Sequence, residues 1–75
     1  MTEISGSFSN YYDLGINCAG SAGDMDLVEA HKWFNLACTG GDERGALARA
    51  SVSMDMTSRE IVEAQRRARS FKYAN

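Results

Sequence analysis

The fold of this 75-residue chain is most strongly constrained by one segment, Asp26-Leu-Val-Glu-Ala-His-Lys-Trp-Phe-Asn-Leu-Ala-Cys38. Wound as an α-helix, it carries apolar side chains around too much of its circumference for a helix with a single neighbour. These side chains are Leu27, Ala30, Phe34, Ala37 and Cys38, flanked by Trp33 and Leu36. Such a helix must pack between several others, and its small alanines let neighbouring backbones approach closely. The segment therefore predicts the inner helix of a stack.

Three other segments carry the apolar spacing of helices. A first helix over about Ser9–Ala19 would bury Tyr11, Leu14, Gly15 and Cys18. A third, over about Glu43–Met54, would bury Ala46, Leu47, Ala50 and Met54. A fourth, beginning at Thr57, would bury Ile61, Ala64, Ala68 and Phe71. We therefore predict an all-α fold of four helices, arranged as two antiparallel helical hairpins.

Local signals support these boundaries. Asp24 or Asp26 can cap the second helix and Asp42 the third, while Thr57 and Glu60 form a capping box for the fourth. Gly15 costs its helix about 1 kcal/mol relative to alanine, which predicts close contact with an aromatic ring of the second helix, Trp33 or Phe34. Residues 1–8 lack a pattern and would form a flexible N-terminal tail before a single domain at residues 9–75.

The region from about Tyr11 to Ala46 resembles a Sel-one-like repeat, a subfamily of the tetratricopeptide solenoids. The positions that match this family are Leu14, Gly15, Gly23, Ala30, Trp33, Phe34, Ala37, Gly41 and Ala46. Ser21 and Cys18 depart from the pattern, and the loop between the first two helices is about one residue short. The resemblance implies a short α-solenoid with one repeat and a C-terminal closing helix, Met56–Arg69, of a kind typical of bacterial arrays.

The same resemblance implies a non-catalytic protein-interaction or scaffold module, because such repeats serve as adaptors. The first helix of each repeat lines the concave surface in that architecture, so the candidate partner-binding residues are Asn10, Tyr12, Asp13, Asn17 and Arg49. Repeat arrays need neighbours to cover their ends. We therefore expect a homodimer through the N-terminal end, at Phe8, Tyr11 and Tyr12, unless Phe8 folds back and leaves a monomer.

Catalytic and ligand-binding signals are weak. His31 is the only histidine and has no catalytic partner in the sequence, so we interpret it as a surface or packed histidine with a hydrogen bond. Metal-ligand spacings such as Cys-x-x-Cys are missing, and Gly20-Ser-Ala-Gly23 lacks the lysine of a phosphate-binding loop. Cys18 and Cys38 are interpreted as small buried residues that could lie near each other. We expect no enzyme activity, no metal and no cofactor.

Charge is divided unevenly along the chain. Residues 1–56 hold three basic and eight acidic side chains, a balance of −5, whereas residues 57–75 hold five basic and two acidic, a balance of +3. Arg66, Arg67, Arg69 and Lys72 could form a basic surface, so a nucleic-acid-associated helical protein is the alternative function. These cations also complement a helix dipole. The net charge of −2 argues against nucleic acid as the main partner.

Composition sets the remaining limits. The chain has 44% hydrophobic and 24% charged residues, which is typical of a globular domain and excludes a largely disordered one. No apolar run reaches the roughly 20 residues of a membrane span, and the polar start Met1-Thr-Glu-Ile-Ser-Gly-Ser7 lacks the features of a signal peptide. We therefore expect a cytoplasmic protein without a membrane partner.

Overall fold

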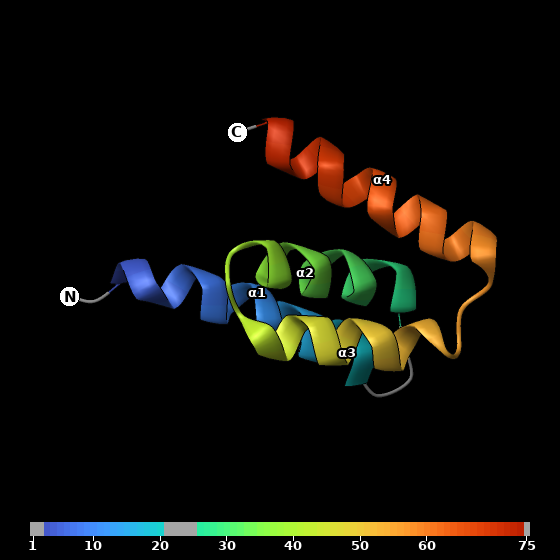
Figure 1. Cartoon of the computed structure of the whole chain (residues 1–75), viewed down its shortest axis with the longest axis horizontal. Helices are drawn as coiled ribbons and strands as arrows, with labels where there is room; N and C mark the ends of the chain where they lie inside the picture. The colour runs from blue at the N-terminus through green and yellow to red at the C-terminus, as the bar shows by residue number, and fades with distance from the viewer. Residues whose placement is uncertain (1–2, 21–25, 75) are drawn as a thin grey trace.

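The computed structural model describes the backbone of residues 3–20 and 26–74 and the side chains of residues 11–20 and 26–71. Within these ranges it contains four helices and no strand, which confirms the all-α prediction (Figure 1). The helices are α1 (Glu3–Gly20), α2 (Leu27–Thr39), α3 (Glu43–Ser53) and α4 (Ser58–Ala74). Helix α1 begins at Glu3 instead of Ser9, inside the segment for which we expected a tail.

Helix α2 is the centre of the molecule. It packs against α1, α3 and α4, and in Figure 1 it runs between α3 and α4 with α1 behind it. Its buried apolar side chains are Ala30, Phe34, Leu36 and Ala37, and Ala64 and Ala68 of α4 complete the buried core of the described residues. The prediction of an inner helix with several neighbours is confirmed.

Two glycines bring the neighbouring helices onto Phe34. A Cβ atom at Gly15 of α1 would lie 2.6 Å from the Phe34 Cδ1 atom, so the ring occupies the space that a larger residue would fill. The predicted contact of Gly15 with an aromatic ring is thus confirmed. A Cβ at Gly45 of α3 would lie 2.6 Å from the Phe34 carbonyl oxygen and 2.8 Å from the Cys38 nitrogen. Helix α1 therefore approaches α2 closely at the Phe34 ring, and α3 approaches it at the backbone.

An aromatic cluster joins α1, α2 and α4. The ring of Tyr11 stacks on Trp33 at 5.7 Å and meets the edge of Phe71 at 6.1 Å, and Trp33 meets Phe71 at 5.3 Å. Such ring pairs stabilise by about 1 kcal/mol beyond their buried area. Tyr11 is therefore half-buried within the chain, and it does not lie on an open N-terminal face as we expected. The Phe8 side chain lies outside the described residues.

The helix ends follow the predicted signals. The Asp26 carboxylate accepts a hydrogen bond from the Glu29 amide at 3.1 Å, and Asp42 accepts one from the Arg44 amide at 3.1 Å. Thr57 and Glu60 cap each other's amides at 3.1 Å and 2.8 Å, as expected of a capping box. Asp24, the other candidate cap of α2, lies outside the described residues.

A glycine turn ends α2. The Gly41 amide donates to the Cys38 carbonyl at 3.0 Å, and the Asp42 amide donates to the Ala37 carbonyl at 2.9 Å. These two bonds form a Schellman motif, with Gly41 in the left-handed region at φ 103°. The sequence Thr39-Gly-Gly41 signals this stop, because glycine takes the left-handed conformation without strain.

The predicted buried face of α3 is wrong for three of its four residues. Leu47 and Met54, which we placed in the core, are 77% and 85% exposed, and Ala50 is exposed as well. The fourth, Ala46, is half-buried, as are Ala48, Arg49 and Val52, and Gly45 is buried. The physical reason is the close approach of Gly45 to the α2 backbone, which turns the glycine face of α3 inward. Leu14 of α1 is also more exposed than we expected.

Helix α4 buries its predicted stripe, but against a different partner. Ala64 and Ala68 are buried and Ile61 and Phe71 are half-buried, as the sequence indicates. The stripe packs on α2, whereas α3 and α4 make at most marginal contact with each other. The second pair of helices is therefore not a packed hairpin, and α4 does not cover the outer side of α3 as we expected of a closing helix.

Candidate interaction surface

Tyr12 connects two of the helices that we expected to form a binding face. Its ring lies 5.7 Å from that of Phe34, and the guanidinium of Arg44 lies 4.1 Å above it from α3. Tyr12 is half-buried, so one side of the ring packs on α2 while α3 supplies a cation for the other contact. Of the sequence-predicted site residues, Tyr12 is thus already engaged by the chain itself.

Asp13 and Arg44 add charge to this place. Arg44 donates from Nε and Nη2 to Asp42 at 3.0 Å and 2.7 Å, a bidentate pair that raises the pKa of Arg44 and lowers the pKa of Asp42. The negative charge of exposed Asp13 also acts on Arg44 and raises its pKa further. We call Tyr12, Asp13, Asp42 and Arg44 the Tyr12 patch. The sequence prediction missed Arg44 because only the packing of α3 places it near α1.

The other predicted site residues are not part of the Tyr12 patch. Arg49 is half-buried and donates to the Asn35 Oδ1 atom of α2 at 2.7 Å, so it holds two helices together. Asn17 is exposed on α1, one turn after Asp13. The side chain of Asn10 lies outside the described residues. The structure therefore brings together Tyr12 and Asp13 and assigns Arg49 to the helix interface.

A second surface feature is the α3 stripe, which we define as Leu47, Ala50 and Met54. The three residues are spaced at i, i+3 and i+7, so they share one face of the helix, and all are exposed. No other helix of the described chain packs extensively on α3 besides α2, which lies on the opposite face. The stripe therefore presents apolar side chains to solvent.

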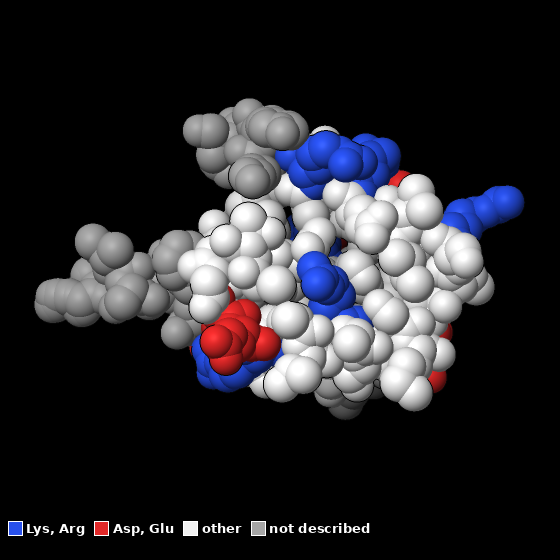
Figure 2. Space-filling view, viewed as in Figure 1, with Lys and Arg blue, Asp and Glu red and all other residues white. Residues whose placement is uncertain are grey.

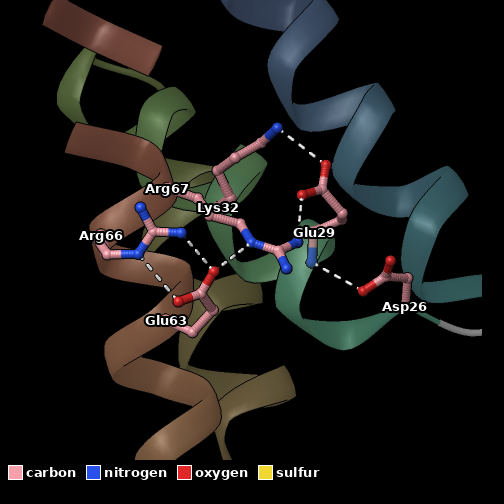
Figure 3. A network of polar contacts seen from close by, with 6 residues as sticks. All are labelled: Asp26, Glu29, Lys32, Glu63, Arg66 and Arg67. Carbon is pink, nitrogen blue, oxygen red and sulfur yellow. Dashed lines mark hydrogen bonds and ion pairs between the residues drawn. The ribbon is translucent and has the colours of Figure 1, made fainter. Parts of the chain in front are cut away.

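The basic C-terminal helix is partly neutralised. Arg66 and Arg67 each bind the Glu63 carboxylate at 2.7 Å, and Arg67 also binds Glu29 of α2 at 2.8 Å. Figure 3 shows Arg67 between these two carboxylates, with Lys32 bound to Glu29 at 2.9 Å on the far side. The hydrogen bonds from Arg66 and Arg67 lower the pKa of Glu63 to about 2.

Lys and Arg side chains gather over α4 in Figure 2, whereas much of the face below it is uncharged. Arg69 is exposed, and the side chain of Lys72 lies outside the described residues. Of the four basic residues that the sequence assigns to this surface, Arg66 and Arg67 thus form ion pairs with carboxylates. These pairs weaken the case for a phosphate-binding helix, because a bound phosphate would have to compete with Glu63 and Glu29.

The two cysteines lie at opposite ends of α2. The Cys18 carbonyl accepts from the Asp26 amide at 3.0 Å, at the start of α2, whereas Cys38 lies in the last turn of that helix. Twelve residues of helix span about 18 Å, far beyond the separation that a disulfide bridges. The sequence left their proximity open, and the structure places them far apart. Burial, followed by the charges of Glu29 and Asp26, raises the pKa of the Cys18 thiol.

Among the residues whose side chains are described, no group of three or more His, Cys, Asp and Glu residues could hold a metal ion. None of the described helices is long and apolar enough to cross a membrane. His31 is buried, at 1% exposure, and its Nδ1 atom has no hydrogen-bond partner. Of the two positions that we considered for His31, surface and packed, the structure therefore shows the packed one. The expected hydrogen bond is not made at this nitrogen.

Comparison of the chain with protein-family models, with curated proteins and with solved structures finds no match. The resemblance to the Sel-one-like repeats therefore remains a prediction from the residues that carry it.

Proposed function

We propose that the protein is a cytoplasmic, non-catalytic protein-interaction module of the Sel-one-like repeat type. The observation that carries this proposal is the α3 stripe, with Leu47 and Met54 almost fully exposed on one helix face. Large apolar side chains that share an exposed face mark contact sites for other proteins. Methionine suits such a site because its flexible thioether adapts to varied surfaces.

The Tyr12 patch supports the same proposal. Tyrosine and arginine are enriched in protein interfaces, where they supply most of the binding energy. Here a tyrosine ring and an arginine from two helices stack on each other beside the exposed carboxylate of Asp13. Because the ring is already held by Phe34 and Arg44, a partner would meet a preorganised surface and would lose less entropy on binding.

A capture experiment tests the proposal. The tagged intact chain would be compared with a variant carrying Leu47→Ser and Met54→Ser, and with Asp13→Lys as a separate variant. Val62→Ser is the matched control, because Val62 is an apolar residue of α4 that is also well exposed. We expect the first two variants to fold normally and to lose bound protein, and the control to retain it. Identical bound proteins in all variants would refute the proposal.

The alternative is a nucleic-acid-associated protein that binds through α4. It has less support, because Arg66 and Arg67 are paired with Glu63 and Glu29. A titration against random duplex DNA at several salt concentrations distinguishes the two functions. Phosphate contacts require an affinity that falls steeply with salt. We expect no such binding at physiological salt.

A further inference from the structure

His31 is a titratable group inside the core. It is the only histidine of the chain, and apart from Phe34 it is the largest fully buried side chain among residues 11–20 and 26–71. A neutral imidazole has one donor and one acceptor nitrogen, whereas an imidazolium has two donors. The Nδ1 atom of His31 makes no hydrogen bond to the described residues. The backbone of His31 itself favours the protonated ring, but burial and the charge of Arg49 outweigh it, so the surroundings suit the neutral ring.

The ring lies on the side of α2 that faces α3. One turn further along α2, Asn35 accepts a hydrogen bond from Arg49, and the backbone of the same helix at Phe34 and Cys38 touches Gly45. The positive charge of Arg49 acts directly on His31. The imidazole and the guanidinium therefore share the α2–α3 contact.

The described charges on the other helices, at residues 11–20 and 58–71, do not offset this arrangement. Glu29 and Lys32 of α2 pair with each other and, through Glu29, with Arg67 of α4, away from the α3 side of the helix (Figure 3). Asp13 of α1 is exposed and acts on Arg44 in the Tyr12 patch. A carboxylate that could neutralise a protonated His31 is thus not found among the groups that act on it.

We propose that His31 makes the α2–α3 contact an acid-sensitive latch, which is closed while the ring is neutral and loosens α3 when the ring is protonated. Protonation would place a second positive charge beside Arg49 in a buried site without a new acceptor, which is costly. Helix α3 would respond first because it contacts mainly α2 and has little contact with α4. This pH response depends only on the buried environment of His31 and not on the proposed function.

The pH range of the effect follows from linkage. Burial, and then the charge of Arg49, lowers the pKa of His31 below its ordinary value of 6.5. Well above pH 6.5 the ring is neutral in both the folded and the unfolded chain, so His31 does not make stability depend on pH there. Below it the unfolded chain binds the proton first. The unfolding equilibrium constant then rises by up to about tenfold per pH unit, until the folded pKa is reached.

Urea unfolding of the intact chain between pH 7.5 and pH 5 tests the proposal, with His31→Gln as the variant. We expect the wild-type unfolding constant to rise below pH 6.5 and the variant to be nearly flat over this range. The carboxylates of Glu29, Asp42 and Glu63 have lowered pKa values, so their contribution changes mainly toward the acid end of this range and below it. The His31→Gln variant carries the same carboxylates, so its slope measures their effect. A wild-type slope in the His31→Gln variant would overturn the proposal.

Two further measurements keep the test decisive even if His31→Gln fails to fold. The imidazole Cε1 proton of the single histidine gives the folded pKa of the wild-type chain by NMR, and a value at or above 6.5 would overturn the proposal. Amide exchange at pH 7 and pH 5.5, corrected for intrinsic rates, compares α3 with α4. We expect protection to fall more in α3, and an equal fall in both helices would refute a latch at the α2–α3 contact.

Discussion

Helices α2 and α3 are similar in length and both contain several small residues, yet they have opposite environments. Helix α2 is enclosed by three neighbours and buries Phe34 almost completely, whereas α3 leaves Leu47 and Met54 in solvent. The difference shows that the number of apolar residues on a short helix does not determine which of them are buried. They are buried where neighbouring helices can approach, and here Gly15 and Gly45 determine those places.

The largest expected effect is the difference in stability between a Phe34→Ala variant and a Leu47→Ala variant. Phe34→Ala removes a buried ring that packs on Gly15 and Tyr12 of α1. This should cost about 3–5 kcal/mol, which approaches the whole stability of so small a domain. Leu47→Ala should change the free energy of unfolding by less than about 0.5 kcal/mol, because its side chain is mostly in solvent. Thermal and urea unfolding followed by circular dichroism measure both. Similar losses in the two variants would contradict the described packing.

Gly45 is the next test of the comparison. Gly45→Ala adds a Cβ that would collide with the Phe34 carbonyl oxygen and the Cys38 amide nitrogen, which are backbone atoms and cannot rotate away. We expect a loss of about 1–3 kcal/mol, measured by urea unfolding. Gly20→Ala is the control, because nothing lies within 4 Å of its added Cβ, and it should be neutral or slightly stabilising. An unaffected Gly45→Ala protein would mean that α3 does not approach α2 so closely.

The ion pairs between α2 and α4 should contribute less. Burial raises the pKa of Glu29, but the hydrogen bonds from Lys32 and Arg67 outweigh it and lower the pKa overall. Glu29 therefore stabilises the fold above its ordinary pKa of 4.5, and this contribution is lost as the pH falls below that value. We expect Glu29→Gln to cost about 1 kcal/mol at pH 7 and low salt, and less at high salt.

Asp55→Asn, an exposed position after α3, is the matched control for Glu29→Gln. Both variants would be unfolded in urea at two salt concentrations and at pH 7 and pH 3.5. The difference between them should shrink in salt and in acid. A difference that stays constant under all four conditions would exclude an ionic origin.

Self-association should have the smallest effect on stability. We predict a homodimer through the outer side of α1, the N-terminal helix, where Leu14 and Ile16 are exposed in its second half. Light scattering over a hundredfold concentration range should show the mass rising toward twice the monomer value. Leu14→Ser with Ile16→Ser should abolish the rise, whereas Leu47→Ser should not. A monomeric wild type at the highest concentration would rule out the dimer.

The sequence predicted the parts of the fold that depend on local chemistry. The helix caps at Asp26, Asp42 and Thr57 and the stop at Gly41 are recognisable because each satisfies backbone groups of its own helix end. The wide apolar surface of α2 and the contact of Gly15 with a ring were predictable because few alternatives can bury such a surface.

Long-range packing was harder to predict. The inward face of α3 depends on Gly45, which has no apolar side chain and therefore gives no signal in a hydrophobic pattern. The contact of Arg44 with Tyr12 and the docking of α4 on α2 depend on how whole helices are placed. Arg49 shows the same limit, because the sequence placed it on a binding face whereas its hydrogen bond to Asn35 lies between helices.

The exposure of Leu36 and Leu47 is the most direct test of the central claim, that α2 is enclosed and α3 packs through Gly45. Both are leucines, one in the core of α2 and the other on the α3 stripe. A soluble paramagnetic agent added to methyl-labelled protein should strongly broaden the NMR signals of Leu47 and leave those of Leu36 almost unchanged. Equal protection of the two leucines would show that the α3 stripe is covered and would contradict the account.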